Sequence, residues 1–167
     1  MQKWMSPPSG MYKANRDIAL DAKQNRMGIG VITRDVKGAV AGSMSRTVSM
    51  SHEPANGEAM GALAAAEFSR DTGLFNIILE GNSKQVVDAI TSKGSHWCKY
   101  GHIIGDICEV MKGFRRWEVG HVKREANEAA HVLAKTTTRE IGEKIWLEDV
   151  PSIILDVVNQ EQIALSV

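Results

Sequence analysis

The hydrophobic and polar positions along the chain change period several times, which is typical of a domain that mixes strands and helices. The first part of the sequence favours three strands, at residues 11–18, 27–34 and 39–49. The tetrapeptide Asp35-Val36-Lys37-Gly38 is a turn signal between the second strand and the third. Because a connection this short cannot make a crossover, we expect the strands to form an antiparallel meander.

A helical period replaces the strand pattern after the meander. The alanine-rich residues 54–72 predict a helix that ends at Gly73, since glycine is common just beyond helix C-termini. The further elements expected are, in chain order, a buried strand at residues 76–79, a short helix capped by Ser83, a helix that carries Ile103, Ile104, Ile107 and Val110, a strand at residues 117–122, and a long final helix from Arg124 onward. The order βββαβααβα indicates one α/β domain.

Length, charge and cysteine content narrow the class of protein. A chain of 167 residues with 43% hydrophobic side chains is sufficient for one compact domain. Its 20 basic and 20 acidic side chains leave no global positive field, so any binding of nucleic acid should be local and weak. Cys98 and Cys108 match no metal-ligand spacing and are too few for a disulfide framework, so we expect reduced thiols.

The sequence contains no segment that reads as a signal or a membrane anchor. The opening MQKWMSPPSG lacks the apolar core of a signal peptide. No stretch approaches the roughly 20 apolar residues that a membrane-spanning helix requires. We therefore expect a soluble, intracellular protein that does not contact a membrane.

Four polar residues mark the ends of successive predicted elements. Asp17 lies on the first strand, and Glu58 lies in the first helix. Asn82 follows the fourth strand, and His131 lies in the last helix. Their order along the chain is more informative than any one of them, because strand ends and a following helix can bring such side chains to one site.

The segments around these residues resemble the plant ribonuclease H-like family, which is of the reverse-transcriptase-associated type. WMSPPSGMYKANRD is similar to W-x-x-P-P-x-G-x-x-K-x-N-x-D, and MGIGVITRDVKG to the glycine-rich strand and turn that follow. EAMGALAAAEF is similar to the family's E-A-x-A-L helix, with one extra residue between the alanines. LEGNSKQVVDAI is similar to E-S-D-S-x-x-V-V-x-x-I. GHVKREANEAAHVLAK is similar to H-V-x-R-E-x-N-x-x-A-D-x-L-A-K. Trp146, Pro151 and Ile153 are similar to the W-x-x-x-P-P-x-I ending, with Val150 in place of its first proline.

The resemblance implies an α/β fold of the ribonuclease H-like type. We expect a mixed five-stranded sheet, with three antiparallel strands followed by two parallel additions, flanked by helices. The domain would span residues 1–145, and residues 146–167 would form a C-terminal tail. The resemblance also implies an RNA–DNA hybrid endoribonuclease, although a shared fold does not by itself carry an activity.

The family's catalytic positions correspond here to Asp17, Glu58, Asn82 and His131, where the family has Asp, Glu, Asp and Asp. Two metal ions about 3.5–4 Å apart activate the water and stabilise the leaving oxygen in such hydrolysis. Mg²⁺, the cofactor that the resemblance implies, prefers anionic oxygen ligands, so Asp17 and Glu58 are the expected metal ligands. Neutral Asn82 and His131 lower the charge of the site from about −4 to about −2. The lower charge weakens catalysis by two magnesium ions. A transition metal is one alternative cofactor, because the imidazole of His131 would suit it, and Mn²⁺ is another.

Each of the two replaced positions has a structural alternative. Asn82 precedes a helix start, where Asn favours turn and capping geometry whatever the function. His131 shares a helix face with Glu128, so a solvated or Glu128-paired histidine is an alternative to a transition-metal ligand. Basic residues around the fifth strand include Lys123 and Arg124, which are candidates for phosphate contact.

These observations favour a ribonuclease H-like nucleic-acid-binding domain with weak affinity for an RNA–DNA hybrid or another nucleic acid and with lost or reduced magnesium-dependent activity. One alternative is a non-catalytic protein-interaction module that presents its tail at Ile153, Ile154, Leu155 and Val157. The other is an active nuclease that uses a different metal, with His131 as a ligand.

Overall fold

The computed structural model describes residues 1–49, 54–92, 101–136 and 141–166. The strands are β1 (Tyr12–Asp21), β2 (Arg26–Arg34), β3 (Val40–Ser49), β4 (Asn76–Gly81), β5 (Arg116–His121) and β6 (Gly142–Leu147). The helices are α1 (Pro54–Asp71), α2 (Lys84–Thr91), α3 (Gly101–Met111), the short 3-10 helix η1 (Arg124–Ala126), α4 (Glu128–Thr136) and α5 (Ser152–Leu165). The expected α/β class is confirmed. No helix in the described part of the chain has the length and apolar character to cross a membrane.

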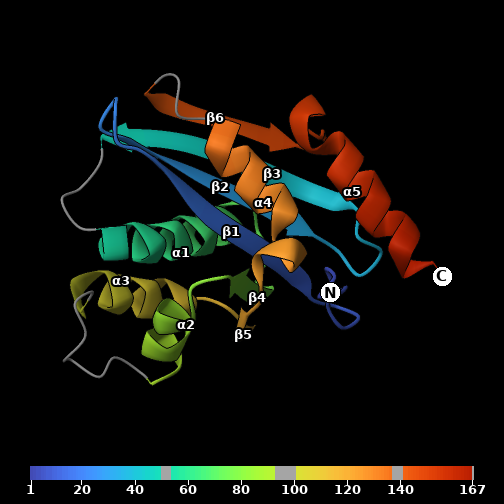
Figure 1. Cartoon of the computed structure of the whole chain (residues 1–167). Coiled ribbons are helices and arrows are strands. Elements are labelled where there is room, and N and C mark those ends of the chain that lie inside the picture. The colour runs from blue at the N-terminus through green and yellow to red at the C-terminus, as the bar shows by residue number, and fades with distance from the viewer. Residues whose placement is uncertain (50–53, 93–100, 137–140, 167) are drawn as a thin grey trace.

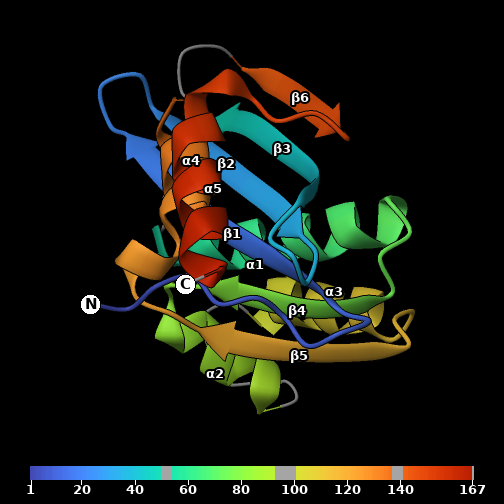
Figure 2. The ribbon, with the colours of Figure 1, turned by 90° about the vertical axis from the view of Figure 1, so that its right-hand side faces the viewer.

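The strands form one mixed sheet in the order β5-β4-β1-β2-β3-β6. Strands β1, β2 and β3 form the predicted antiparallel meander, and β4 and β5 are added in parallel beside β1. The expected count of five strands is wrong, because β6 pairs antiparallel with β3 at the far edge. Most side chains of β6 are exposed, so this edge strand lacks the buried pattern that identifies the others. Figure 2 shows β5 and β6 at opposite edges of the sheet.

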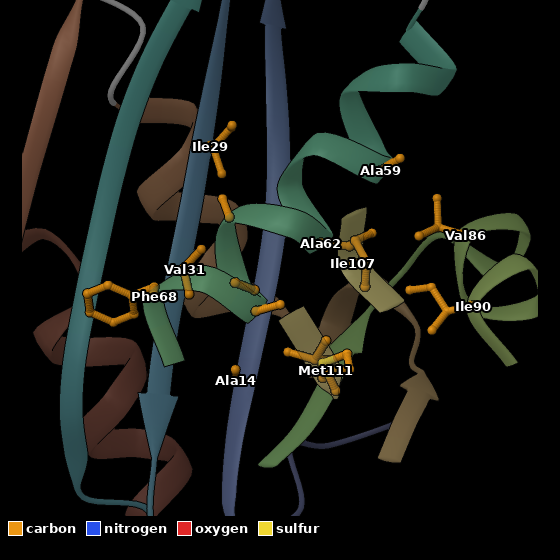
Figure 3. Packing of buried hydrophobic residues seen from close by; sticks show 14 of the residues in the cluster. Ala14, Ile29, Val31, Ala59, Ala62, Phe68, Val86, Ile90, Ile107 and Met111 are labelled. Carbon is orange, nitrogen blue, oxygen red and sulfur yellow. The ribbon is translucent and has the colours of Figure 1, made fainter. Parts of the chain in front are cut away.

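Helices cover the two faces of the sheet unequally (Figure 1). Helices α1, α2 and α3 lie against one face, where a large core forms between them and β1, β2 and β4. Figure 3 shows part of this core, in which Phe68 of α1 and Met111 of α3 approach Val31 and Ala14 of the sheet. Helices α4 and α5 lie against the other face over a smaller core built around Ile32.

Helix α4 touches β2 directly because Gly30 carries no side chain. A Cβ atom placed on Gly30 would lie 2.5 Å from the carbonyl oxygen of Ala130 and 2.6 Å from the amide nitrogen of Ala134. Gly30 is paired with Asp17 of β1 in the sheet. This close approach therefore sets α4 over the centre of β1, beside Asp17.

Two expectations about helix starts have different outcomes. The predicted cap of α2 is confirmed, since the Ser83 side chain accepts a hydrogen bond from the Val86 amide. The expected continuous helix from Arg124 is wrong, because η1 ends at Ala126 and α4 begins only at Glu128. Asn127 between them is fully buried and its side chain is bonded to β1, which fixes it in a non-helical conformation.

The C-terminal segment also forms regular structure. Trp146 and Leu147 belong to β6, and α5 packs its buried residues Ile154 and Val158 onto the smaller core. Cys108 is a free, partly exposed thiol. Cys98 lies outside the described residues.

Candidate functional site

Asp17 and His131 are in direct contact. The imidazole Nδ1 of His131 lies 2.9 Å from Asp17 Oδ2, with exposed side-chain fractions of 18% and 3%. An ionised carboxylate only accepts hydrogen bonds, so this contact requires that His131 Nδ1 carries the hydrogen whenever Asp17 is ionised. The contact with Asp17 replaces the pairing with Glu128 that helix spacing suggested. That expectation was wrong because α4 packs so closely on β2 and β1 that His131 faces the sheet.

Glu58 lies in the first turns of α1 and interacts electrostatically with Asp17. Burial, together with the negative charge of Asp17, raises the pKa of Glu58 to about 7, and the positive charges of Arg16 and Arg124 oppose the rise. The pKa of Glu58 thus lies close to neutral pH, where its carboxylate is only partly ionised.

Asn82 comes directly after β4, beside the middle of β1. The parallel register pairs Asn15 with Glu80, which brings the residues after Glu80 toward the level of Asp17. The amide oxygen of Asn82 is buried and has no hydrogen-bond partner among the described residues. The cap of α2 is provided by Ser83, so Asn82 does not fill the capping role that its sequence position allowed.

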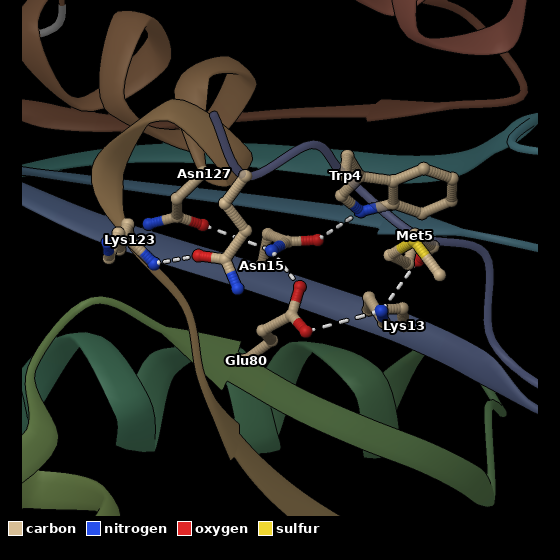
Figure 4. A network of polar contacts seen from close by, with 8 residues as sticks. Trp4, Met5, Lys13, Asn15, Glu80, Lys123 and Asn127 are labelled. Atoms are coloured by element: carbon tan, nitrogen blue, oxygen red, sulfur yellow. Dashed lines mark hydrogen bonds and ion pairs between the residues drawn. The ribbon is translucent and has the colours of Figure 1, made fainter. Parts of the chain in front are cut away.

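A buried polar network lies next to the site, and its members were not assigned a role from sequence (Figure 4). Asn15 Nδ2 donates to Glu80 Oε2 at 2.9 Å and to Asn127 Oδ1 at 3.0 Å. Asn127 Nδ2 donates to the carbonyl oxygen of Arg16 at 2.8 Å, which ties the start of α4 to β1. Two family motifs contain these asparagines. Asn15 is the asparagine of K-x-N-x-D, and Asn127 is the asparagine of R-E-x-N, so both could have been singled out from the sequence.

The N-terminal segment closes this network from one side. Trp4 Nε1 donates to Asn15 Oδ1 at 2.9 Å, and the indole ring packs against Arg34 at 4.0 Å from the guanidinium carbon to the ring centroid. Lys13 Nζ lies 3.2 Å from Glu80 Oε1 and donates to the carbonyl oxygen of Met5. With Asn15 and Lys13 as partners, the buried carboxylate of Glu80 is a structural group and not a spare ligand.

The basic candidates lie between β5 and α4. Lys123 and Arg124 are exposed, and the positive charge of Arg124 reaches Glu58. The backbone amide of Lys123 donates to Gln2 Oε1 at 2.6 Å, so the N-terminal segment also holds this connection in place. Both cationic side chains are exposed to solvent, and of the two it is Arg124 that is linked electrostatically to the candidate positions, through Glu58.

The donors at the four positions do not fit a pair of Mg²⁺ ions. Both carboxylate oxygens of Asp17 accept hydrogen bonds, one from the Ile18 amide and one from His131. Mg²⁺ demands anionic oxygens in near-octahedral geometry, and Asn82 and His131 supply none. Within residues 1–49, 54–92, 101–136 and 141–166, no group of three or more His, Cys, Asp or Glu side chains is placed to hold a metal ion.

A groove elsewhere on the surface is separate from this site. It is lined by Leu133, Trp146, Pro151 and Ile153, among other residues of α4, β6 and α5. None of the four candidate positions lines it. The candidate site is therefore defined by the contact between Asp17 and His131 and not by this groove.

The fold and the placement of Asp17 beside α4 define a ribonuclease H-like domain, and solved structures agree. A ribonuclease H1 from Halobacterium salinarum matches with a TM-score of 0.66 and 24% identity over 74% of this chain and 93% of that chain. The N-terminal ribonuclease H domain of a Mycobacterium tuberculosis protein matches with a TM-score of 0.66 and 17% identity, covering 74% and 90%. A ribonuclease H1 isolated from compost, solved in complex with an RNA/DNA hybrid, matches with a TM-score of 0.64 and 20% identity, covering 73% and 92%.

The sequence also matches the model of a protein family. The model described as "Reverse transcriptase-like" matches residues 15–137, so the chain belongs to the reverse transcriptase-like family. A comparison with curated proteins found no match.

Proposed function

We propose that this chain is a ribonuclease H-like domain of the plant type that binds an RNA–DNA hybrid or a related nucleic acid weakly, with magnesium-dependent cleavage lost or greatly reduced. The observation that carries the proposal is the hydrogen bond between His131 Nδ1 and Asp17 Oδ2. It engages a carboxylate oxygen that a metal would otherwise use, with a residue that stands where the resembled family has an acid.

Binding of nucleic acid is supported by the exposed cations beside the site. Lys123 and Arg124 are exposed and lie just before α4, the helix that carries His131, and the charge of Arg124 acts on Glu58, so they are candidates to contact a phosphate backbone. The compost ribonuclease H1 with the same fold was solved with an RNA/DNA hybrid. Because the whole chain has no net charge, the binding energy would come from this local group.

The alternative of a protein-interaction module has one observation in its favour. Ile153 and Leu155 on α5 are 49% and 42% exposed, whereas Ile154 is fully buried against α4. Only part of the tail could then contact a protein partner. A nuclease with a transition metal at His131 is the other alternative, since Nε2 of the imidazole is not used by Asp17.

Binding is tested by fluorescence anisotropy with a labelled RNA–DNA hybrid over a series of salt concentrations. We expect weak binding that falls steeply with salt, and we expect Lys123→Ala plus Arg124→Ala to reduce the log–log salt slope by about one to two. The matched control is Lys37→Ala plus Lys144→Ala, which removes two exposed cations far from β5. Tight, salt-insensitive binding, or an equal effect of both pairs, would refute this assignment of the interface.

Cleavage is tested with the same hybrid and a panel of Mg²⁺, Mn²⁺, Zn²⁺ and Co²⁺. We expect no magnesium-dependent cleavage above that of Asp17→Asn, which serves as the inactive reference. Cleavage with magnesium at an ordinary enzymatic rate would overturn the proposal. Cleavage with a transition metal alone, abolished by His131→Ala, would establish the alternative nuclease instead.

A further inference from the structure

Arg16 is a fully buried cation directly beside Asp17. It lies on the face of β1 that carries Ala14 and Ile18 into the core under α1, and it is 2% exposed. Its Nη1 and Nη2 atoms are buried and have no hydrogen-bond partner among the described residues. An unpaired guanidinium in such a position is costly, so an electrostatic reason for its presence is required.

Three acids provide that reason. The negative charges of Glu58, Asp17 and Glu80 all stabilise the charged form of Arg16 against the desolvation that burial imposes. The net result is a pKa lowered only to about 10, so Arg16 is a full cation at neutral pH. Glu80 is already bonded to Lys13 and Asn15. The charge of Arg16 is thus chiefly available to Glu58 and Asp17, the two acids retained at the site.

The chain also leaves space for this guanidinium. A Cβ atom placed on Gly81 of β4 would lie 2.9 Å from Arg16 Cζ and 3.1 Å from its Nη1. The pattern E-S-D-S, to which residues 80–83 are similar, has serine at position 81. A serine there would require the buried guanidinium of Arg16 to shift from the place it has here, so the residues at positions 81 and 16 constrain each other.

We propose that Arg16 is a built-in counter-cation of the acid site, supplying from inside the protein the positive charge that metal ions would bring. Arg16 lies on one face of β1 within electrostatic reach of the acids, and His131 bonds Asp17 from the other face, so positive charge and a hydrogen bond already stabilise the acids that magnesium would need as ligands. This inference deepens the proposed loss of magnesium dependence and rests on it. Its test uses melting without nucleic acid, so its failure is distinguishable from a failure of hybrid binding.

The test compares variants in a background where the two lost acids are restored, Asn82→Asp plus His131→Asp. With Arg16 retained, we expect millimolar magnesium to leave the melting temperature unchanged, because Arg16 already supplies positive charge to the acids. With Arg16→Met added, magnesium should raise it by roughly 5 °C, as a ligand that binds only the folded state does. Arg34→Met in the same background is the matched control, because Arg34 is equally buried but pairs with Glu161 on α5.

A purely structural role for Arg16 would lower stability in both arginine variants without creating a response to magnesium. The proposal predicts a response in Arg16→Met alone. It is overturned if the background that retains Arg16 shows the same magnesium shift, if Arg34→Met gains one, or if Arg16→Met gains none.

A second variant is used if the Arg16→Met protein does not fold. If the Arg16→Met protein does not fold without metal, Arg16→Gln in the same background removes the charge and keeps polar character. Magnesium must then restore folding of at least one of the two variants, because it supplies the missing charge, and no rescue of either one refutes the proposal.

The packing of Arg16 on Gly81 is tested in the otherwise unaltered chain by Gly81→Ser, with and without Arg16→Met. We expect Gly81→Ser to lower the melting temperature by several degrees when Arg16 is present, and by much less when it is absent. Equal effects in the two backgrounds would show that Arg16 does not occupy this space, and the counter-cation assignment would fall with it.

Discussion

At the scale of single residues, the site consists of charges that are controlled by burial. Glu58 is the clearest case, because burial comes first among the causes that raise its pKa and the charge of Asp17 adds to it. A carboxyl whose pKa is higher in the folded state than in the unfolded state favours folding while it is protonated. Its contribution is complete below the ordinary pKa of 4.5 and is lost as the pH rises through about 7.

Glu58→Gln should therefore remove a pH-dependent loss of stability. We expect the variant to gain stability relative to the unaltered chain as the pH rises from 4.5 to above 7, by up to about 3 kcal/mol, since one pKa unit corresponds to about 1.4 kcal/mol. The measurement is urea unfolding at several pH values. Glu109→Gln on the exposed surface of α3 is the control. A difference between Glu58→Gln and the unaltered chain that does not change with pH would contradict the assignment.

At the scale of elements, the distance between α4 and the sheet determines whether His131 reaches Asp17. Gly30 makes that distance short, because only a residue without Cβ tolerates the backbone of Ala130 and Ala134 so close. The obstructing atoms are backbone atoms of a packed helix and cannot move aside cheaply.

Gly30→Ala should displace α4 from β2 and weaken the contact of His131 with Asp17. We expect a loss of about 2–4 kcal/mol in unfolding free energy, at the upper end for overpacking because backbone must move. Gly105→Ala is the matched control, since a Cβ there meets nothing within 4 Å and an exposed helical alanine is favoured by about 1 kcal/mol over glycine. Chemical denaturation measures both, and NMR titration of His131 reports the contact. Equal stability of the two variants would exclude the close-packing account.

The same elements show what sequence reasoning could reach. The meander, α1, β4 and the Ser83 cap were predictable because each has its own local pattern of apolar residues or turn signals. Strand β6 was not, because an exposed edge strand has no apolar alternation. The break before α4 was missed because Asn127 leaves the helix only through bonds to residues more than a hundred positions away.

The candidate site also has features that the sequence predicted and features that it did not. The positions of Asp17 and His131 followed from motifs, yet their contact depends on how α4 packs on β2, which a linear pattern does not contain. Arg16 was missed for a related reason. A charged side chain in a strand reads as solvent-facing, and its burial is understood only once α1 and Gly81 are placed around it.

At the scale of the whole molecule, Arg34 joins distant parts of the chain. This fully buried residue of β2 packs on Trp4 of the N-terminal segment and forms an ion pair with Glu161 of α5 at 3.0 Å. Burial raises the pKa of Glu161 and lowers that of Arg34, so each charge depends on the other in the folded state. The pair thus holds α5 to the sheet at the cost of desolvating both groups.

Glu161→Gln should cost about 2–4 kcal/mol, because it leaves the buried charge of Arg34 without its counter-charge. Glu143→Gln is the comparison, since it breaks the pair with Arg46 at the surface, where both side chains are 34% or more exposed. That loss should be below about 1 kcal/mol. Thermal and urea unfolding measure both. Similar small losses would mean that α5 is held by its apolar contacts alone.

The close approach of Arg16 to Gly81 has an evolutionary consequence. A side chain at position 81 meets the guanidinium of Arg16, because a Cβ atom there lies 2.9 Å from Arg16 Cζ. A residue larger than glycine at position 81 therefore requires either that the buried guanidinium moves or that a smaller residue occupies position 16. In related sequences we expect the residue at position 81 to vary together with the residue at position 16.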